Sequence, residues 1–285
     1  MSRTAKKKVL PVPAGAKIAF QGELGAFSQH AASRIFGTAI EPFPCLTFED
    51  AFNAVARKRA ECAVIPIENT LAGSIHQNFD LLARHSLDVV AETSLRVEHH
   101  LIGHPGTSLR QIKQIYSHPA ALEQCKGLLR RLRKIEKISF YDTAGSVKFI
   151  RDRGLWTAAA VASEDAARIY GMKILRRGIE DDPENYTRFL GLARRNRFPA
   201  GGDKTSIVFG LENEPGVLFK ALSVFALRNI DLTKIESRPI RGKPWQYLFY
   251  LDLQSDIRDR DCRHALRHLR ELAPYLKILG SYLIF

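Results

Sequence analysis

Residues 17–36 read KIAFQGELGAFSQHAASRIF, and this stretch contains the unit from which the first two-thirds of the chain is built. The apolar run from Lys17 to Phe20 predicts a strand, Gly22 to Gly25 a loop, and the apolar spacing from Phe27 to Phe36 a helix. Short apolar runs at 62–67, 112–116, 138–141 and 158–162 are each followed by a helical pattern, at 74–84, 119–132, 144–151 and 164–170. Strand, turn and helix repeated in this way predict an α/β domain with mostly parallel sheets.

A different pattern begins after residues 194–203, which contain Pro199, Gly201 and Gly202 and have the composition of a linker. Strands are expected beyond it at 205–211, 231–239, 245–253 and 276–283, and helices at 216–228 and 259–272. This βαββαβ order is the ferredoxin-like unit. So small a sandwich leaves a sheet face or edge uncovered, and we therefore expect the chain to self-associate.

The composition is that of a globular protein with two domains. The chain has 285 residues, of which 45% are hydrophobic and 26% charged. No apolar run approaches the roughly 18 residues of a membrane-spanning helix, so no membrane association is expected.

Residues 1–16 are expected to form a flexible basic leader, since the two prolines in 9–13 suit a signal peptide poorly. Four scattered cysteines are expected to be reduced thiols, and the location cytoplasmic.

The formal net charge of +13 raises the question of a polyanionic partner. Basic clusters at 130–134 and 194–197 are not interleaved with aromatic residues, so a solvated surface is favoured over a nucleic-acid interface. A cleft for a small polyanion is the competing interpretation. No nucleic-acid partner is expected.

Polar turns follow the predicted strands of the first domain at 22–25, 68–74, 117–119 and 142–146. Ligands of open α/β sheets bind at such turns, where the free N–H groups of helix starts suit anions. Each turn alone is also an ordinary helix cap. The four together favour a site that holds an anion from several sides.

The segment 185–189 reads NYTRF and places amide, hydroxyl and guanidinium groups beside an apolar strand. We expect Arg188 to clamp a carboxylate; the alternative is a surface arginine paired with Asp181 or Asp182. His99 and His100 are adjacent and would point to opposite faces of a strand, which makes a shared metal ion improbable. No Walker loop, GxGxxG, HExxH or GxSxG motif is present, so neither metal nor cofactor is expected.

Five segments, in order, resemble those of prephenate dehydratases: 21–28 (QGELGAFS), 64–74 (VIPIENTLAGS), 116–119 (YSHP), 142–146 (DTAGS) and 185–189 (NYTRF). The segments 215–219 (PGVLF) and 235–239 (IESRP) resemble the two motifs of the ACT regulatory domain. The resemblance implies a two-lobed catalytic domain, similar to periplasmic binding proteins, at 17–198. The first lobe would comprise about 17–98 and 185–194, the second about 99–184, and the ACT domain 203–285.

The resemblance also implies an activity, the decarboxylative dehydration of prephenate to phenylpyruvate in phenylalanine biosynthesis. Thr187 and Arg188 are its expected catalytic residues, with Thr187 donating a hydrogen bond to the leaving hydroxyl and Glu68 as an alternative acid. The expected substrate-binding residues are Asn69, Thr70, Ser117, His118, Thr143, Ala144, Asn185 and Phe189.

Feedback inhibition by L-phenylalanine is implied for the ACT domain, with the effector bound between two regulatory domains of a homodimer or homotetramer. The expected effector-binding residues are Asn213, Gly216, Val217, Leu218, Glu236, Ser237 and Arg238.

Two other functions remain open. Arogenate dehydratases carry the same motifs, and a carboxylate placed to meet the ammonium group of arogenate would favour that substrate. A non-catalytic sensor is the other, although it would not need the hydroxyl of Thr187.

Overall fold

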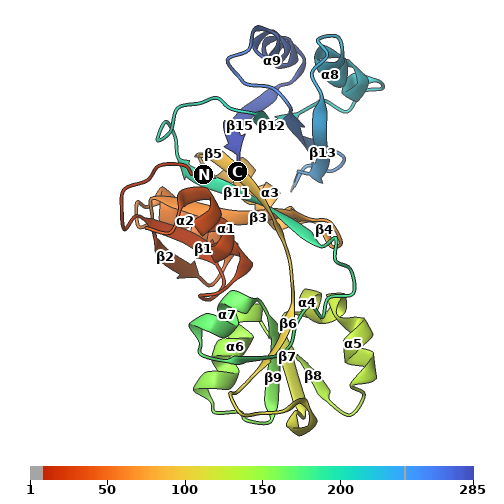
Figure 1. Ribbon diagram of the computed structural model, residues 1–285. Coiled ribbons are helices and arrows are strands. Elements are labelled where there is room, and N and C mark those ends of the chain that lie inside the picture. The colour runs from red at the N-terminus through yellow and green to blue at the C-terminus, as the bar shows by residue number, and fades with distance from the viewer. Residues whose placement is uncertain (1–8, 241) are drawn as a thin grey trace, which may run out of the picture.

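The computed structural model describes residues 9–240 and 242–285 and has three parts (Figure 1). Two α/β lobes lie one below the other, and a third unit caps the upper lobe on the side away from the lower one. The predicted fold class is confirmed: a two-lobed catalytic fold like that of periplasmic binding proteins, followed by a ferredoxin-like βαββαβ unit. No helix in the described ranges is long and apolar enough to cross a bilayer.

Lobe 1 is the upper α/β lobe in Figure 1, and its sheet has the order β5-β11-β3-β1-β2. Its elements are β1 (Lys17–Gln21), α1 (Phe27–Phe36), β2 (Glu41–Cys45), α2 (Phe48–Ala56), β3 (Cys62–Asn69), β4 (Gly73–Ser74), α3 (His76–Arg84), β5 (Leu87–Arg96) and the returning β11 (Tyr186–Arg194). β1 runs parallel to β2 and β3, whereas β11 is antiparallel to both β3 and β5. β11 follows the whole of lobe 2 in sequence and returns to the sheet of lobe 1. One side of the cleft in lobe 1 is therefore formed by the last strand of the catalytic segment.

Lobe 2 has a five-stranded sheet of order β10-β6-β9-β7-β8. Its elements are β6 (His100–Gly103), the 3₁₀ turn η1 (Leu109–Gln111), β7 (Gln114–Ser117), α4 (Pro119–Gln124), α5 (Lys126–Arg131), β8 (Glu136–Ser139), α6 (Thr143–Asp152), β9 (Ala158–Ala162), α7 (Glu164–Ile169) and β10 (Lys173–Arg176). The single helix predicted over 119–132 is wrong, because the chain breaks at Cys125. There the carboxylate of Asp181 accepts a hydrogen bond from the N–H of Gly127 at 2.8 Å. This bond replaces the backbone hydrogen bond that the same N–H would donate in a continuous helix.

The regulatory unit consists of β12 (Lys204–Gly210), α8 (Val217–Ala226), β13 (Leu232–Pro239), β14 (Tyr247–Leu253), α9 (Arg260–Leu272) and β15 (Tyr275–Ile284). Its antiparallel sheet has the order β13-β14-β12-β15, and α8 and α9 cover one face. The other face packs on lobe 1, where Val208, Tyr250 and Leu279 share a core with Leu81. β15 also pairs in parallel with β5, which makes one ten-stranded sheet of both units.

The segment before β1 is only partly described. Residues 1–8 of the expected flexible leader lie outside the described residues. The rest of the leader is packed rather than flexible: Leu10 donates its N–H to the carbonyl of Ile35 at 2.7 Å, and Val12 and Ala16 pack on the core beneath α1. The prediction of a flexible leader is therefore wrong for residues 9–16.

Candidate functional site

A cavity of about 530 Å³ lies between the two lobes and is lined from both. The lining includes five residues predicted to bind or act on the substrate: Asn69, His118, Thr143, Thr187 and Phe189. Its wall is formed where β1, β3 and β11 of lobe 1 end or pass, and where α4 and α6 of lobe 2 begin. None of the described lining residues is lysine or arginine. An anion in this cavity would therefore be held by N–H groups, hydroxyls and amides.

The hydroxyl of Thr187 is oriented by a neighbouring amide. Thr187 and Asn69 are partners in the register of β11 and β3, and the Asn69 side-chain nitrogen donates to Thr187 Oγ1 at 2.9 Å. The Asn69 side-chain oxygen accepts the N–H groups of Leu71 and Ala72, which fixes which end of the amide is the donor. Since Thr187 Oγ1 accepts this hydrogen bond, its own proton is free to be donated to a group in the cavity.

The same amide chain determines the protonation of His99, which also lines the cavity. Asn69 donates to the Asn185 side-chain oxygen at 2.7 Å, so the Asn185 nitrogen is the donor to Gln124 Oε1 at 3.1 Å. His99 Nε2 lies 3.0 Å from that oxygen and must carry a hydrogen, which leaves Nδ1 as a buried acceptor with no partner among the described residues. Burial lowers the pKa of His99, which favours this neutral form.

Asp142 joins the two lobes at the start of α6. Its carboxylate accepts the N–H of Gly145 at 2.8 Å, as a helix cap, and the N–H of Glu23 from lobe 1 at 3.2 Å. Burial raises the pKa of Asp142. At the start of α4, His118 Nδ1 accepts the N–H of Ala120 at 3.2 Å. These two turns thus hold the helix starts at the cavity.

Four predicted substrate-binding residues do not line the cavity. Ser117 is fully buried and donates to the carbonyl of Val161 at 2.6 Å, and Ala144, in the first turn of α6, is fully buried. Thr70 donates to the carbonyl of Glu184 at 2.8 Å, where the chain returns to lobe 1. Asn185 is likewise buried and acts only through Asn69 and Gln124. In this structure these residues therefore support the wall of the cavity and do not face the substrate directly.

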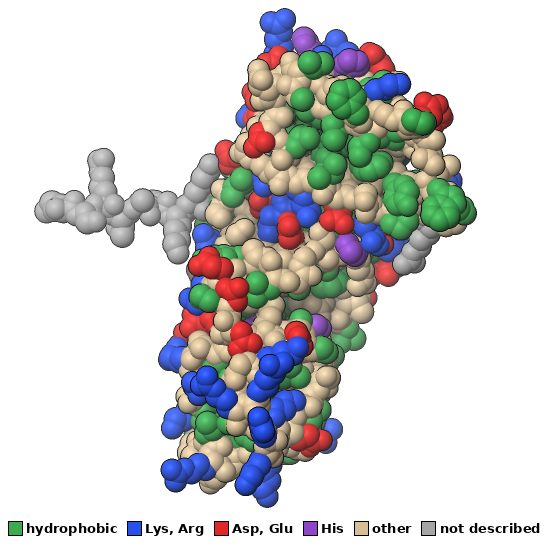
Figure 2. Space-filling model, turned by 90° about the vertical axis from the view of Figure 1, so that its right-hand side faces the viewer, with side chains coloured by type: hydrophobic (Ala, Val, Ile, Leu, Met, Phe, Trp, Pro, Cys, Tyr) green, Lys and Arg blue, Asp and Glu red, His purple; other side chains and the backbone are tan. Residues whose placement is uncertain are grey.

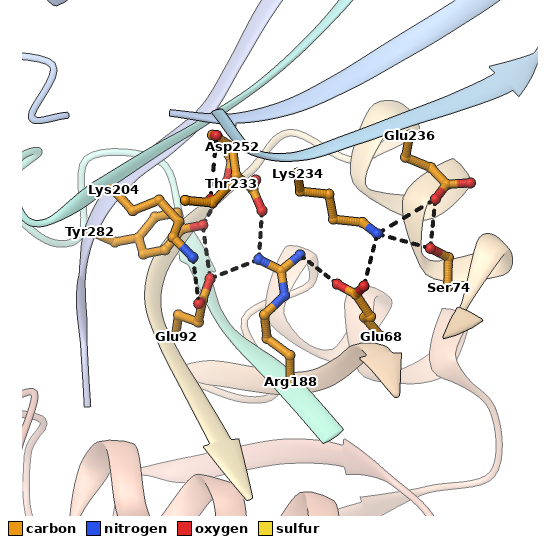
Figure 3. A network of polar contacts seen from close by, with 11 residues as sticks. Glu68, Ser74, Glu92, Arg188, Lys204, Thr233, Lys234, Glu236, Asp252 and Tyr282 are labelled. Atoms are coloured by element: carbon orange, nitrogen blue, oxygen red, sulfur yellow. Dashed lines mark hydrogen bonds and ion pairs between the residues drawn. The ribbon is translucent and has the colours of Figure 1, made fainter. Parts of the chain in front are cut away.

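Arg188 and Glu68, predicted to act on the substrate, do not line the cavity and point toward the regulatory unit instead (Figure 3). Side chains alternate along a strand, so Thr187 and Asn69 face the cavity while Arg188 and Glu68 face the regulatory unit. Arg188 Nη1 lies 2.5 Å from Asp252 and 3.1 Å from Glu92, and Nη2 lies 3.4 Å from Glu68. The alternative pairing of Arg188 with Asp181 or Asp182 is also not found.

A second, smaller pocket of about 210 Å³ lies in the regulatory unit. Four of the predicted effector-binding residues line it: Asn213, Gly216, Val217 and Leu218. Gly216 precedes α8 with φ 76°, a backbone conformation that favours glycine. Trp245, Tyr247 and Phe249 complete the wall and were not predicted.

The second predicted effector motif is divided between the two faces of β13. Ser237 is exposed, whereas Glu236 and Arg238 point to lobe 1 and do not line this pocket. Glu236 accepts from Ser74 at 2.6 Å, and Arg238 pairs with Asp80 at 3.2 Å. The strand alternation is again the reason for the correction.

Comparisons with known proteins agree on this architecture. The family model of prephenate dehydratase matches residues 18–197, and that of the ACT domain matches 205–261. An Arabidopsis thaliana protein named arogenate dehydratase/prephenate dehydratase 2, chloroplastic, is 48% identical over 93% of this chain and 72% of its own length. The crystal structure of an Arthrobacter aurescens prephenate dehydratase in complex with L-Phe superposes with a TM-score of 0.85 at 30% identity, covering 94% of this chain and 90% of that one. A structure described as a novel type of quorum quenching acylase gives a TM-score of 0.84 at 36% identity, covering 93% and 97%.

Proposed function

Because the chain belongs to the prephenate dehydratase family, we propose that it removes carbon dioxide and water from prephenate to give phenylpyruvate. One observation carries the proposal: Thr187 presents a hydroxyl whose proton is free, at a cavity walled by both lobes. The catalytic domain at 17–198 and the regulatory domain at 203–285 are part of the same proposal, as is a cytoplasmic location.

In this reaction the ring carboxylate leaves as carbon dioxide and its electron pair enters the ring. The carbon–oxygen bond at the opposite ring carbon breaks with its own pair, and the departing hydroxide takes up a proton to become water. Thr187 stabilises the departing oxygen by a hydrogen bond, because a threonine hydroxyl does not titrate near neutral pH. The helix starts at His118 and Thr143 supply positive dipole ends for the carboxylates. Aromatisation of the ring drives the step, so positioning is the main task of the protein.

Arogenate is the second candidate substrate, and one feature of the cavity favours it. Asp142 is an acidic residue in the lining. An ammonium group offers donors to its carboxylate, whereas the keto group of prephenate offers none.

The experiment is to assay the purified protein on prephenate and on arogenate in parallel, following phenylpyruvate and phenylalanine. Turnover of prephenate supports the proposal, and turnover of arogenate alone assigns the second candidate. Hydrolysis of an N-acyl amide is the third arm, because of the similar acylase structure. Silence in all three arms from a folded sample would support a ligand sensor.

Regulation by phenylalanine is proposed for the pocket around Gly216, covered by a second copy of the chain. Exposed apolar side chains support that assembly: Phe219, Ile235 and Trp245 are 75%, 50% and 76% exposed. Figure 2 shows hydrophobic side chains gathered on one face of the regulatory unit. A homodimer or homotetramer would cover this face.

A further inference from the structure

Four charged residues join the catalytic strands to the regulatory domain, and together we call them the charge square: Glu68, Arg188, Lys234 and Asp252 (Figure 3). Glu68 and Arg188 are cross-strand partners in β3 and β11, and Lys234 and Asp252 are cross-strand partners in β13 and β14. Each pair carries one charge of each sign and faces the other pair. Arg188 lies 2.5 Å from Asp252, and Lys234 lies 3.2 Å from Glu68.

Three of the four side chains of the charge square are largely shielded from water. Those of Arg188, Lys234 and Asp252 are 15%, 11% and 12% exposed, whereas that of Glu68 is 38% exposed. Glu92, bonded to Arg188 at 3.1 Å and to Lys204 at 2.7 Å, extends it inward. In such surroundings the positions of the partners are tightly linked, because a separated charge would remain buried without compensation.

The charge square lies close to both sites: its catalytic side is near the cavity between the lobes, and its regulatory side is near the effector pocket around Gly216. On the catalytic side, Arg188 and Glu68 are the sequence neighbours of Thr187 and Asn69, whose side chains bond to one another at the cavity. On the regulatory side, β14 carries Phe249 in the wall of the effector pocket and Asp252 in the charge square. A displacement of β14 would therefore move Arg188 through its ion pair with Asp252, and a displacement of β13 would move Glu68 through its ion pair with Lys234. Arg188 is joined to Thr187 by one peptide bond, so its movement would shift the Thr187 hydroxyl.

We propose that the charge square couples the effector pocket to the catalytic hydroxyl, and that Arg188 is a positioning residue rather than a substrate ligand. This inference rests on the proposed function and specifies its regulation. Coupling of this kind requires that the effector bind the two arrangements of the strands with different affinity. Lys234 and Asp252 are expected to be needed for inhibition but not for binding of phenylalanine.

The test uses the full chain with Asp252→Asn or Lys234→Gln, and phenylalanine as the probe. Phenylalanine binding is measured by calorimetry, and turnover is measured with and without it. We expect both variants to bind phenylalanine within about threefold of the wild type while the inhibition factor falls at least about tenfold, within the usual range of allosteric coupling. By reciprocity, a bound substrate analogue should also cease to change phenylalanine affinity in them.

Lys277→Gln is the matched control. Lys277 is also an interdomain lysine, half-buried and donating to the carbonyls of Leu82 and His85 at 2.7 and 2.6 Å, but none of its hydrogen bonds goes to β3 or β11. It should keep full inhibition. Full inhibition of Asp252→Asn or Lys234→Gln with normal phenylalanine binding would overturn the inference. If the wild type itself binds no phenylalanine, the proposed regulation fails first, and the coupling fails with it.

Discussion

At the scale of single residues, two neighbours in sequence perform tasks in different sites. Thr187 faces the cavity and Arg188 faces the regulatory domain, although both were predicted to act on the substrate. The segment 185–189 identified the strand, but the sequence alone does not show which face of β11 meets the cleft. His99 and Gln124 were missed as cavity residues, because the fold, and no local sequence pattern, brings them to the cleft.

Thr187→Ala should lower kcat on the true substrate at least about 100-fold, since positioned proton donors contribute typically 10²–10⁴-fold. Thr187→Ser keeps the hydroxyl and serves as the control, with most of the activity retained. Steady-state kinetics of both variants decide the role. A folded Thr187→Ala protein with a near-normal rate would exclude it.

Arg188→Met separates positioning from direct binding of substrate. Loss of a positioning residue should lower kcat while KM stays within about threefold, whereas loss of a carboxylate clamp would raise KM steeply. Asp252 would also be left buried without Arg188, and Glu92 would keep only Lys204, so the free energy of unfolding should fall by about 3–5 kcal/mol. Kinetics and urea unfolding measure the two effects. A rise in KM at unchanged kcat would instead support direct binding of a substrate carboxylate by Arg188.

At the scale of elements, the predicted alternation of strands and helices is confirmed in outline, and its failures have specific physical causes. β2 was not predicted, because Pro42 and Pro44 argue against a strand; it is tolerated at the edge of the sheet, where N–H groups need no partner. The break between α4 and α5 depends on Asp181, which lies 54 positions from Gly127 in sequence. Distant partners of this kind leave no signal in a local pattern.

Asp142→Ala tests the element that joins the lobes. It removes the cap of α6 and the acceptor of the Glu23 N–H, so the free energy of unfolding should fall by roughly 1–2 kcal/mol. Asp152→Ala, at the exposed far end of the same helix, should change it by less than about 0.5 kcal/mol. Urea unfolding of the two variants gives the comparison. Equal effects would show that the cap contributes nothing specific.

At the scale of the whole molecule, burial keeps several histidines neutral. Burial lowers the pKa of His85, His99 and His100 below the ordinary value of 6.5. The unfolded chain therefore binds more protons than the folded one below about pH 6.5, and stability should rise with pH across that window. Urea unfolding at pH 7.5 and pH 5.5 should show the lower free energy of unfolding at pH 5.5. His99→Asn should reduce this difference, and a flat profile would contradict the assignment.

The parallel contact between β15 and β5 has a consequence for the order of synthesis. Thr93 Oγ1 donates to the carbonyl of Phe285, and the two residues are 192 positions apart. A nascent chain would thus carry β5 with both edges unpaired until β11 is translated, and with the edge that pairs with β15 unpaired until the end of the described sequence is translated. Such an edge attracts strands of other molecules. A fragment ending at the interdomain linker would keep it permanently, and so should aggregate even though its cleft residues are all present.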